Sequence, residues 1–307
     1  MSGEQEDLEY LAALLPGDGL RSPGDDAALI EAGGKLLVTT DSVVEGIHFP
    51  PGASATRIAA KLLHRNLSDL AAMAAEPKGF VAAFVFGPGW PRVRRRRFYR
   101  ALALRARSWG LEWVGGDLSS TEGPAVLSLT LWGRPPRGGG LRRSGLRPGD
   151  LLHVSGRLGG APYGGRHLRF RPRVALARKL CTEVRPRAMM DLSDGLAADL
   201  PRMLRASGAL GALLEADALP VHPDAWRSPL RAGPLGPLAA ALGDGEDYEL
   251  LVGLSPERSR ALRGAAGFPP VLRRPIGRVV EEPGLRLRMP GGEVRLLEVE
   301  GWEHGFE

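Results

Sequence analysis

The sequence contains few of the residues that stabilise extracellular or membrane proteins. Its 307 residues include one cysteine, Cys181, so no internal disulfide can form, which fits a reducing compartment. No apolar run approaches the roughly 18 residues that a membrane-spanning helix needs. The acidic N-terminal stretch MSGEQEDLEY lacks the basic and apolar regions of a signal peptide. We therefore expect a cytoplasmic protein with no membrane partner, and Cys181 as a small buried residue rather than a nucleophile.

Lysine is also scarce, because only four of the 41 basic residues are lysines and the rest are arginines. Arginine hardly ever loses its proton, so the pI near 10.0 mainly reflects that composition. The most concentrated basic stretch is PRVRRRRFYRALALRARSWG at 91–110. An approximate apolar stripe runs through it, formed by Val93, Phe98, Ala101, Leu102, Leu104 and Trp109. We interpret it as a helix with a solvated arginine face, and a nucleic-acid-binding surface is the less favoured alternative.

Two common phosphate-transfer signatures are missing. There is no G-x-x-x-x-G-K-[ST] motif, which excludes a P-loop protein, and no H-R-D motif of the protein-kinase type. What the chain does have is ordinary globular composition, with 43% hydrophobic and 25% charged residues, and enough length for two cores.

Short apolar runs and helical periodicities alternate along both halves of the chain. We predict strands at 35–43, 79–87, 111–117, 125–133, 151–156, 188–194, 211–217, 247–254 and 294–300, and helices at 54–77, 91–110, 172–182 and 195–207. The run RPPRGGGLRRSGLRPGD cannot form a core element. We therefore place an N-terminal domain at 1–135, a linker at 136–148 and a C-terminal domain at 149–307. The alternation predicts an α/β or α+β protein.

Aspartates cluster at the ends of the apolar runs. The clusters are PGDDAAL at 23–29, VTTDSVVEGIHF at 38–49, NLSDLAAM at 66–73, VGGDLSS at 114–120, MMDLSDGLAADL at 189–200 and GDGEDYELL at 243–251. Taken singly, Asp25, Asp150 or Asp194 is most simply a turn former or helix cap, and His48 a structural histidine. So many clusters at strand ends are harder to ascribe to capping. Carboxylates that share one rim of a sheet repel one another unless a cation neutralises them. Oxygen ligands alone suit Mg²⁺ or Mn²⁺, which also bind phosphate, so we predict a metal site for a phosphate substrate.

In this order and at these intervals, the motifs GDDAAL, TTDSVVEGIHF, NLSDLAAM, GGDLSS, DLSDGL and GEDYEL resemble the thiamine-monophosphate kinase family. That family belongs to the superfamily of aminoimidazole-ribotide synthetase and selenophosphate synthetase. The resemblance runs from about residue 20 to the terminal GWEHGF. It implies a two-domain PurM-like architecture with a C-terminal α/β domain, and a homodimer in which N-terminal strands form a barrel. It also implies ATP-dependent phosphorylation of thiamine monophosphate to thiamine diphosphate by direct transfer, with several Mg²⁺ ions.

The resemblance further implies roles for individual residues. The family's metal ligands correspond to Asp26, Thr39, Thr40, Asp41, Asp69, Asp117, Asp191 and Asp194. ATP contacts correspond to Gly116, Asp117, Arg143 and Ser193, and substrate contacts to His48, Glu246 and Trp302. The acceptor oxygen is already anionic, so we assign no general base, and Arg143 would stabilise the charge of the transition state.

The sequence departs from the family pattern at several positions. Ala74 stands where glycine is usual, Asp244 stands where a small residue is commoner, and Trp302 replaces a tyrosine. The segment 155–165 lacks the acidic residue expected after Leu-Gly. A different acceptor, as in the ribotide synthetases, is the alternative enzyme function.

Overall fold

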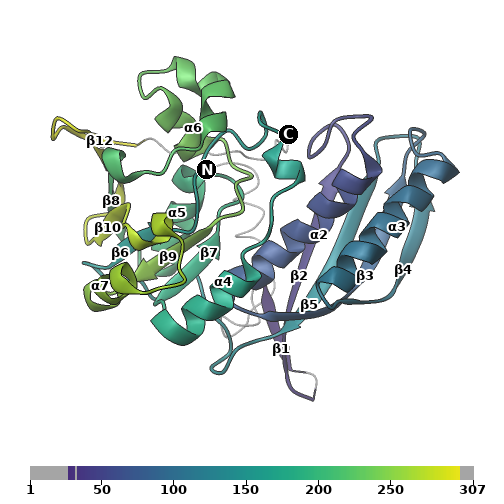
Figure 1. The fold of residues 1–307 in the computed structure, drawn as a ribbon, viewed down its shortest axis with the longest axis horizontal. Coiled ribbons are helices and arrows are strands. Elements are labelled where there is room, and N and C mark those ends of the chain that lie inside the picture. Colours follow the sequence, from purple (N-terminus) through teal and green to yellow (C-terminus); the bar gives the residue numbers. More distant parts are fainter. Residues whose placement is uncertain (1–26, 32, 298–307) are drawn as a thin grey trace.

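The computed structural model describes residues 27–31 and 33–297, so Asp26 and Trp302 lie outside the described residues. Figure 1 shows two sheets side by side, each with its own helices, and the chain passes from one to the other near residues 135–150. Among the described residues, no helix is both long and apolar enough to cross a bilayer.

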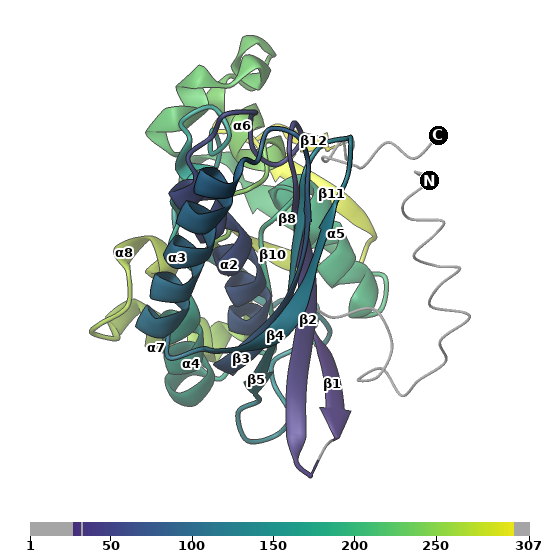
Figure 2. The same ribbon diagram turned by 90° about the vertical axis from the view of Figure 1, so that its right-hand side faces the viewer.

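The N-terminal half is a five-stranded sheet in the order β1-β2-β5-β3-β4. The strands are β1 (Ala28–Glu31), β2 (Lys35–Val44), β3 (Glu76–Phe86), β4 (Glu112–Ser120) and β5 (Val126–Arg134). Helices α2 (Ala55–Ala72) and α3 (Arg92–Ser108) pack on the same face of this sheet (Figure 2). Leu127, Leu129 and Leu131 of β5 point toward these helices and are fully buried. The residues between them are only half-buried, because side chains alternate between the two faces of a strand.

The C-terminal half is a seven-stranded mixed sheet in the order β12-β11-β8-β10-β6-β9-β7. Among these neighbouring pairs, β11 and β8 are parallel to each other and the rest are antiparallel. Its strands are β6 (Leu151–Val154), β7 (Ala188–Asp191), β8 (Gly211–Glu215), β9 (Leu250–Leu254), β10 (Gly277–Val280), β11 (Gly284–Arg288) and β12 (Val294–Leu296). Its helices are α4 (Val174–Lys179), which continues into a π-helical turn, α5 (Leu196–Ala206), α6 (Pro237–Gly243), α7 (Pro256–Gly264) and α8 (Pro270–Arg273). The mixed α/β fold confirms the predicted class.

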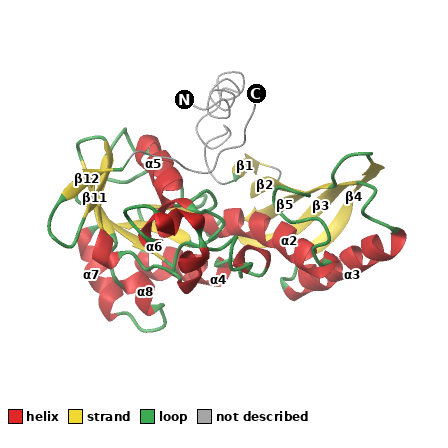
Figure 3. Cartoon of the chain, turned by 90° about the horizontal axis from the view of Figure 1, so that it is seen from above, coloured by secondary structure: helices red, strands yellow, loops and turns green. Residues whose placement is uncertain are grey.

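Helix α2 joins the two halves (Figure 3). The ring of His64 donates from Nδ1 to the carbonyl of Phe170 at 2.7 Å, and the hydroxyl of Ser68 donates to Asp191 Oδ2 at 2.6 Å. Apolar residues of both halves also form one continuous core around α2, in which Leu67 packs in the same cluster as Val252. The position of the C-terminal half is therefore fixed largely by side chains of one N-terminal helix.

The arginine-rich segment forms helix α3, as predicted, but its apolar stripe is narrower than expected. Phe98 and Leu102 are fully buried, whereas Val93 and Leu104 are 61% and 59% exposed. The helix packs mainly through Phe98, which contacts Phe84 edge-on at 5.1 Å, so residues to either side of this line face solvent. Cys181 is only half-buried, although burial still raises the pKa of its thiol.

Candidate active site

A cavity of about 660 Å³ lies between the two halves. The N-terminal half contributes the turn 46–50 and Arg65, and the C-terminal half contributes loops 162–168, 193–194 and 244–248. The lining residues include His48, Arg65, Tyr163, His167, Ser193, Asp194, Asp244, Glu246 and Tyr248. The cavity therefore brings together His48, Ser193, Asp194 and Glu246, which the family resemblance had marked.

Two loops of the C-terminal half hold the floor of the cavity. The amide of Glu246 donates to the carbonyl of Ser193 at 2.6 Å, and that of Tyr248 donates to Leu192 at 2.8 Å. Glu246 and Tyr248 both adopt left-handed backbone conformations, with φ of 56° and 52°. Such residues typically cost on the order of 1–3 kcal/mol each and concentrate at functional sites. The loop 244–248 is therefore a strained segment at the floor of the cavity.

Asp194 is positioned by a neighbour that the sequence did not reveal as functional. The amides of Ser193 and Asp194 both donate to Asp199 Oδ2 at 3.0 Å, and Arg202 forms ion pairs with both carboxylates. Asp199 is fully buried, and this burial raises its pKa to about 7. The negative charge of Asp194 raises the pKa of Asp199 further, and the positive charges of Arg202 and Arg143 oppose that rise.

Four of the predicted metal ligands lie on α2 or on the neighbouring strands β2 and β7. Thr39 Oγ1 donates to Asp69 Oδ2 at 2.6 Å, Arg65 lies 3.4 Å from Asp41, and Asp191 accepts from Ser68. Burial raises the pKa of the Asp41 carboxyl, the positive charge of Arg65 opposes this, and the charges of Asp194 and Glu246 raise it further. The Asp41 carboxylate is therefore repelled by the carboxylates of Asp194 and Glu246, and a cation would relieve this repulsion.

The donor atoms of these four side chains fit Mg²⁺. Carboxylate and hydroxyl oxygens are its preferred ligands, and it is commonly held by one or two carboxylates together with water and substrate phosphate. Within residues 27–31 and 33–297, no three His, Cys, Asp or Glu side chains converge on a single point.

Three other predicted residues do not lie with these four side chains. The strand register aligns Asp41 with Leu129, Ala82 and Gly116, so Gly116 lies three strands away, roughly 14 Å at the usual strand spacing. Thr40 bonds to Thr130 at 3.0 Å on the sheet face that α2 and α3 leave uncovered. Asp117 is aligned with the exposed Ala83, so it too points to this open face.

A bulge decides which way Asp117 points. Trp113 is paired with Phe80 and stacks on it at 5.5 Å, whereas the next pair along is Gly115 with Val81. Val114 is therefore an extra residue in β4, and the alternation of side chains reverses after it. Gly116 is required here for packing, because a Cβ would lie 1.9 Å from the carbonyl oxygen of Ala82.

His48 has a defined tautomer. Its Nδ1 accepts a hydrogen bond from the amide of Val44 at 3.0 Å, so the neutral ring carries its proton on Nε2. The ring is almost completely buried at the wall of the cavity. This makes Nε2–H a donor suited to an oxygen of a phosphate or to a ring nitrogen.

The departures at 155–165 and Asp244 compensate for each other. Asp244 accepts from the amide of Gly160 at 2.7 Å and from the hydroxyl of Ser228 at 2.7 Å. Asp247 accepts from the amide of Gly159 at 2.9 Å and from Arg166 at 2.9 Å. The two carboxylates thus bind successive amides of the glycine-rich loop, and the extra charge at Asp244 has a structural use.

Sequence reasoning missed two basic residues of the site, Lys61 and Arg65. Lys61 is fully buried and forms an ion pair with Glu246, and Arg65 follows one helical turn later at the cavity wall. A signal was present, because Lys61 is a rare lysine placed beside Leu62 on the apolar side of a predicted helix.

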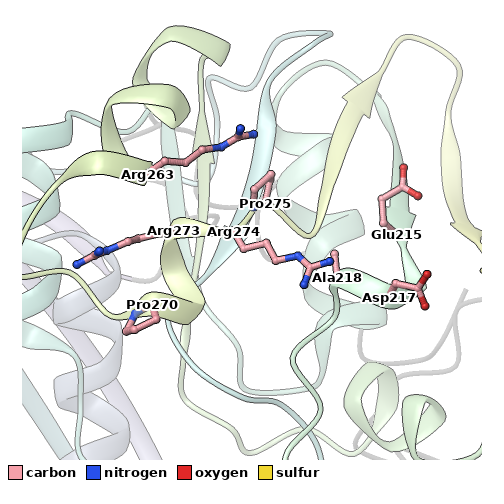
Figure 4. Close-up of a pocket in the computed structure, with 8 residues that line it drawn as sticks. All are labelled: Glu215, Asp217, Ala218, Arg263, Pro270, Arg273, Arg274 and Pro275. Atoms are coloured by element: carbon pink, nitrogen blue, oxygen red, sulfur yellow. The ribbon is translucent and has the colours of Figure 1, made fainter.

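A second hollow lies on the C-terminal half and shares no residue with the cavity. It is lined by Glu215, Asp217, Ala218, Arg263, Pro270, Arg273, Arg274 and Pro275. Figure 4 shows Arg273 and Arg274 pointing in opposite directions, so its arginines do not converge on one anion.

Comparison with known proteins agrees with this geometry. Residues 24–134 match the family model of the AIR synthase related protein, N-terminal domain. The chain is 35% identical to the thiamine-monophosphate kinase of Rhodopirellula baltica, over 92% of this chain and 90% of that one. It is also 35% identical to the corresponding kinase of Caulobacter vibrioides, over 92% and 84% of the two chains. The chain belongs to the thiamine-monophosphate kinase family. It is therefore a phosphotransferase, as the motifs predicted.

Solved structures show the same fold. The structure of AaThiL complexed with AMPPCP and TMP superposes with a TM-score of 0.83 at 27% identity, covering 99% of this chain and 97% of that one. This likeness spans both halves and confirms the predicted PurM-like architecture. Within one chain the five-stranded sheet is open, with β1 and β4 at its edges.

Proposed function

We propose that the chain phosphorylates thiamine monophosphate to thiamine diphosphate, with ATP as donor and Mg²⁺ as the assisting ion. The observation that carries this proposal is the cavity, which gathers His48 and Glu246 with Ser193 and Asp194 from opposite halves. A relative of the same fold binds an ATP analogue and TMP. Membership of the family supports the same reaction here.

The charges in the site fit transfer between two anions. The attacking oxygen belongs to a phosphate and needs no base, so the main obstacle is repulsion between the two substrates. Arg65 at the cavity wall and Arg143 near Asp199 supply positive charge, and His48 supplies a neutral donor. Mg²⁺ would be held by Asp41, Asp69, Asp191 and Asp194, where it neutralises phosphate charge and aligns donor with acceptor.

By family resemblance alone, Asp26 and Thr40 remain proposed metal ligands and Trp302 remains a proposed substrate contact. Asp117 and Gly116 present a different case, because β4 puts them far from Asp41 in the same chain. We propose that Asp117 serves the nucleotide from the open sheet face, at a junction with a second copy of the chain. Val81 on the same face is 37% exposed. Its partners across the sheet are the half-buried Thr130 and the exposed Gly115, and a partner sheet would cover all three.

The reaction is tested by ADP release and by mass detection of thiamine diphosphate. We expect wild-type turnover only when ATP, Mg²⁺ and thiamine monophosphate are all present. Asp69→Asn should lower kcat by about 100-fold or more, because a ligand oxygen for the ion is replaced by an amide. Asp217→Asn, an exposed carboxylate in the second hollow, is the matched control and should keep full activity. Turnover of ribotide acceptors in place of thiamine monophosphate would contradict the assignment of the substrate.

A further inference from the structure

Lys61 sits behind the cavity wall, where it touches both halves of the molecule. It projects from α2 and is fully buried. Its Nζ donates to the backbone carbonyl of His48 at 2.5 Å and to the two carboxylate oxygens of Glu246 at 2.7 and 2.6 Å. The three donors of one ammonium are thereby used on two residues that line the cavity from opposite halves.

Lys61 adds a link between two residues that are each held within their own half. Glu246 has a left-handed backbone, and its amide donates to the carbonyl of Ser193. The imidazole of His48 is oriented from the other side by the amide of Val44. Lys61 therefore completes the fixing of both groups, whereas Lys61 itself does not line the cavity.

The lysine is charged in this setting. Burial lowers the pKa of Lys61 to about 8, and the carboxylate of Glu246 opposes that shift, so the ammonium is the main form at neutral pH. An ammonium buried without Glu246 would be costly, and so would a carboxylate buried without Lys61. The Lys61–Glu246 ion pair therefore stabilises the contact between the two halves only when both residues are present.

We propose that Lys61 is a positioning residue for the acceptor: it clamps the Glu246 carboxylate of the C-terminal half against the His48 turn of the N-terminal half, and so sets the shape of the acceptor pocket. This rests on the proposed function, in which His48 and Glu246 contact thiamine monophosphate. Ser193, a proposed nucleotide contact, bonds to the backbone amide of Glu246 but not to its carboxylate, and its own amide is held separately by Asp199. Lys61 should therefore govern binding of the acceptor much more than binding of ATP.

The test compares Lys61→Met with Arg57→Met, which removes an exposed cation one turn earlier on the same helix. We expect Lys61→Met to raise KM for thiamine monophosphate at least 10-fold, with KM for ATP changed less than 3-fold. Arg57→Met should change neither. Equal increases in both KM values, or none, would overturn the proposal.

Two further measurements keep the test decisive. If Lys61→Met folds poorly, Lys61→Met combined with Glu246→Gln removes both charges, and its KM for the acceptor should equal that of Glu246→Gln alone. A further rise in the double variant would refute the clamp. Hydrogen exchange of peptides 44–50 and 243–250 without substrate should be faster in Lys61→Met than in Arg57→Met. Unchanged exchange would refute positioning even if the wild type used another acceptor, whereas faster exchange without turnover would refute only the proposed reaction.

Discussion

At the residue scale, the structure shows how an alanine is accommodated at position 74, where a glycine was expected. The residue follows α2 with a φ of 58°, its amide bonds to the carbonyl of Ala71, and the amide of Ala75 reaches back to Leu70. These two bonds define a Schellman helix end, in which the left-handed position favours glycine. The Ala74 methyl group is nearly fully buried, however, so its packing partly offsets the backbone strain.

We expect Ala74→Gly to change the free energy of unfolding by less than about 0.5 kcal/mol, since relief of roughly 1 kcal/mol of strain offsets about 0.8 kcal/mol of lost burial. Ala74→Val should lose at least about 2 kcal/mol, because a β-branched residue is poorly tolerated at positive φ. Urea denaturation measures both. Ala75→Gly, at a buried neighbour without positive φ, should cost about 1 kcal/mol. A large gain in Ala74→Gly would show that packing at this site is negligible.

At the scale of elements, His153 connects the second sheet to the helices that cover it. It lies on β6, donates from Nδ1 to the carbonyl of Leu272 on α8 at 2.8 Å, and bonds through Nε2 to Ser259 on α7 at 3.0 Å. Burial is the main cause that lowers the pKa of His153 to about 4, and the charge of Arg263 lowers it further. The ring is therefore neutral in the folded protein at all ordinary pH values.

This linkage predicts a loss of stability in mild acid. Protonation near pH 6.5 favours the unfolded chain, so the contribution of His153 is complete above pH 6.5 and is lost as the pH falls toward 4. Between pH 7.5 and 5, the difference in unfolding free energy between wild type and His153→Asn should shrink by up to about 2 kcal/mol. Urea titrations at both pH values measure it, and using the difference removes the effect of other titrating groups. A difference independent of pH would contradict the prediction.

Most elements could be predicted from local pattern, because periodicity is a property of neighbours in sequence. The helix predicted at 54–77 is α2, and the strand predicted at 125–133 is β5. Short elements such as α7, α8 and β10 were missed, since they lack a sustained period. In the site, the gathering of His48 and Glu246 followed from family motifs.

The orientation of Asp117 could not be predicted in this way. It depends on the extra residue Val114 and on the order of strands, which are set by pairing between distant segments. Lys61 was missed for a similar reason, because its partner Glu246 lies 185 residues away.

At the scale of the whole molecule, one face of the five-stranded sheet is left uncovered by the described helices. By the strand register, Val81, Thr40 and Ser42 lie on this face, and α2 and α3 cover the opposite one (Figure 2). A second copy of the same sheet would bury this surface, as the proposed homodimer requires.

We expect the wild type to sediment as a dimer and Val81→Glu as a monomer, because a charge would be buried in the centre of the contact. Val81 is outside the helix-facing core, so the far-ultraviolet circular dichroism should not change. Val93→Glu places the same charge on the exposed surface of α3 and should remain dimeric. A wild type that sediments as a monomer at micromolar concentration would rule out this interface.

The single extra residue in β4 has a kinetic consequence. If the bulge turns Asp117 toward a second copy of the chain, a single chain lacks this carboxylate in its own site. Each chain then supplies its Asp117 to the site of the other copy. The rate per molecule should then fall with dilution, although every polypeptide stays folded. Through one extra residue in a strand, the reaction rate would depend on the concentration of the protein as well as on that of its substrates.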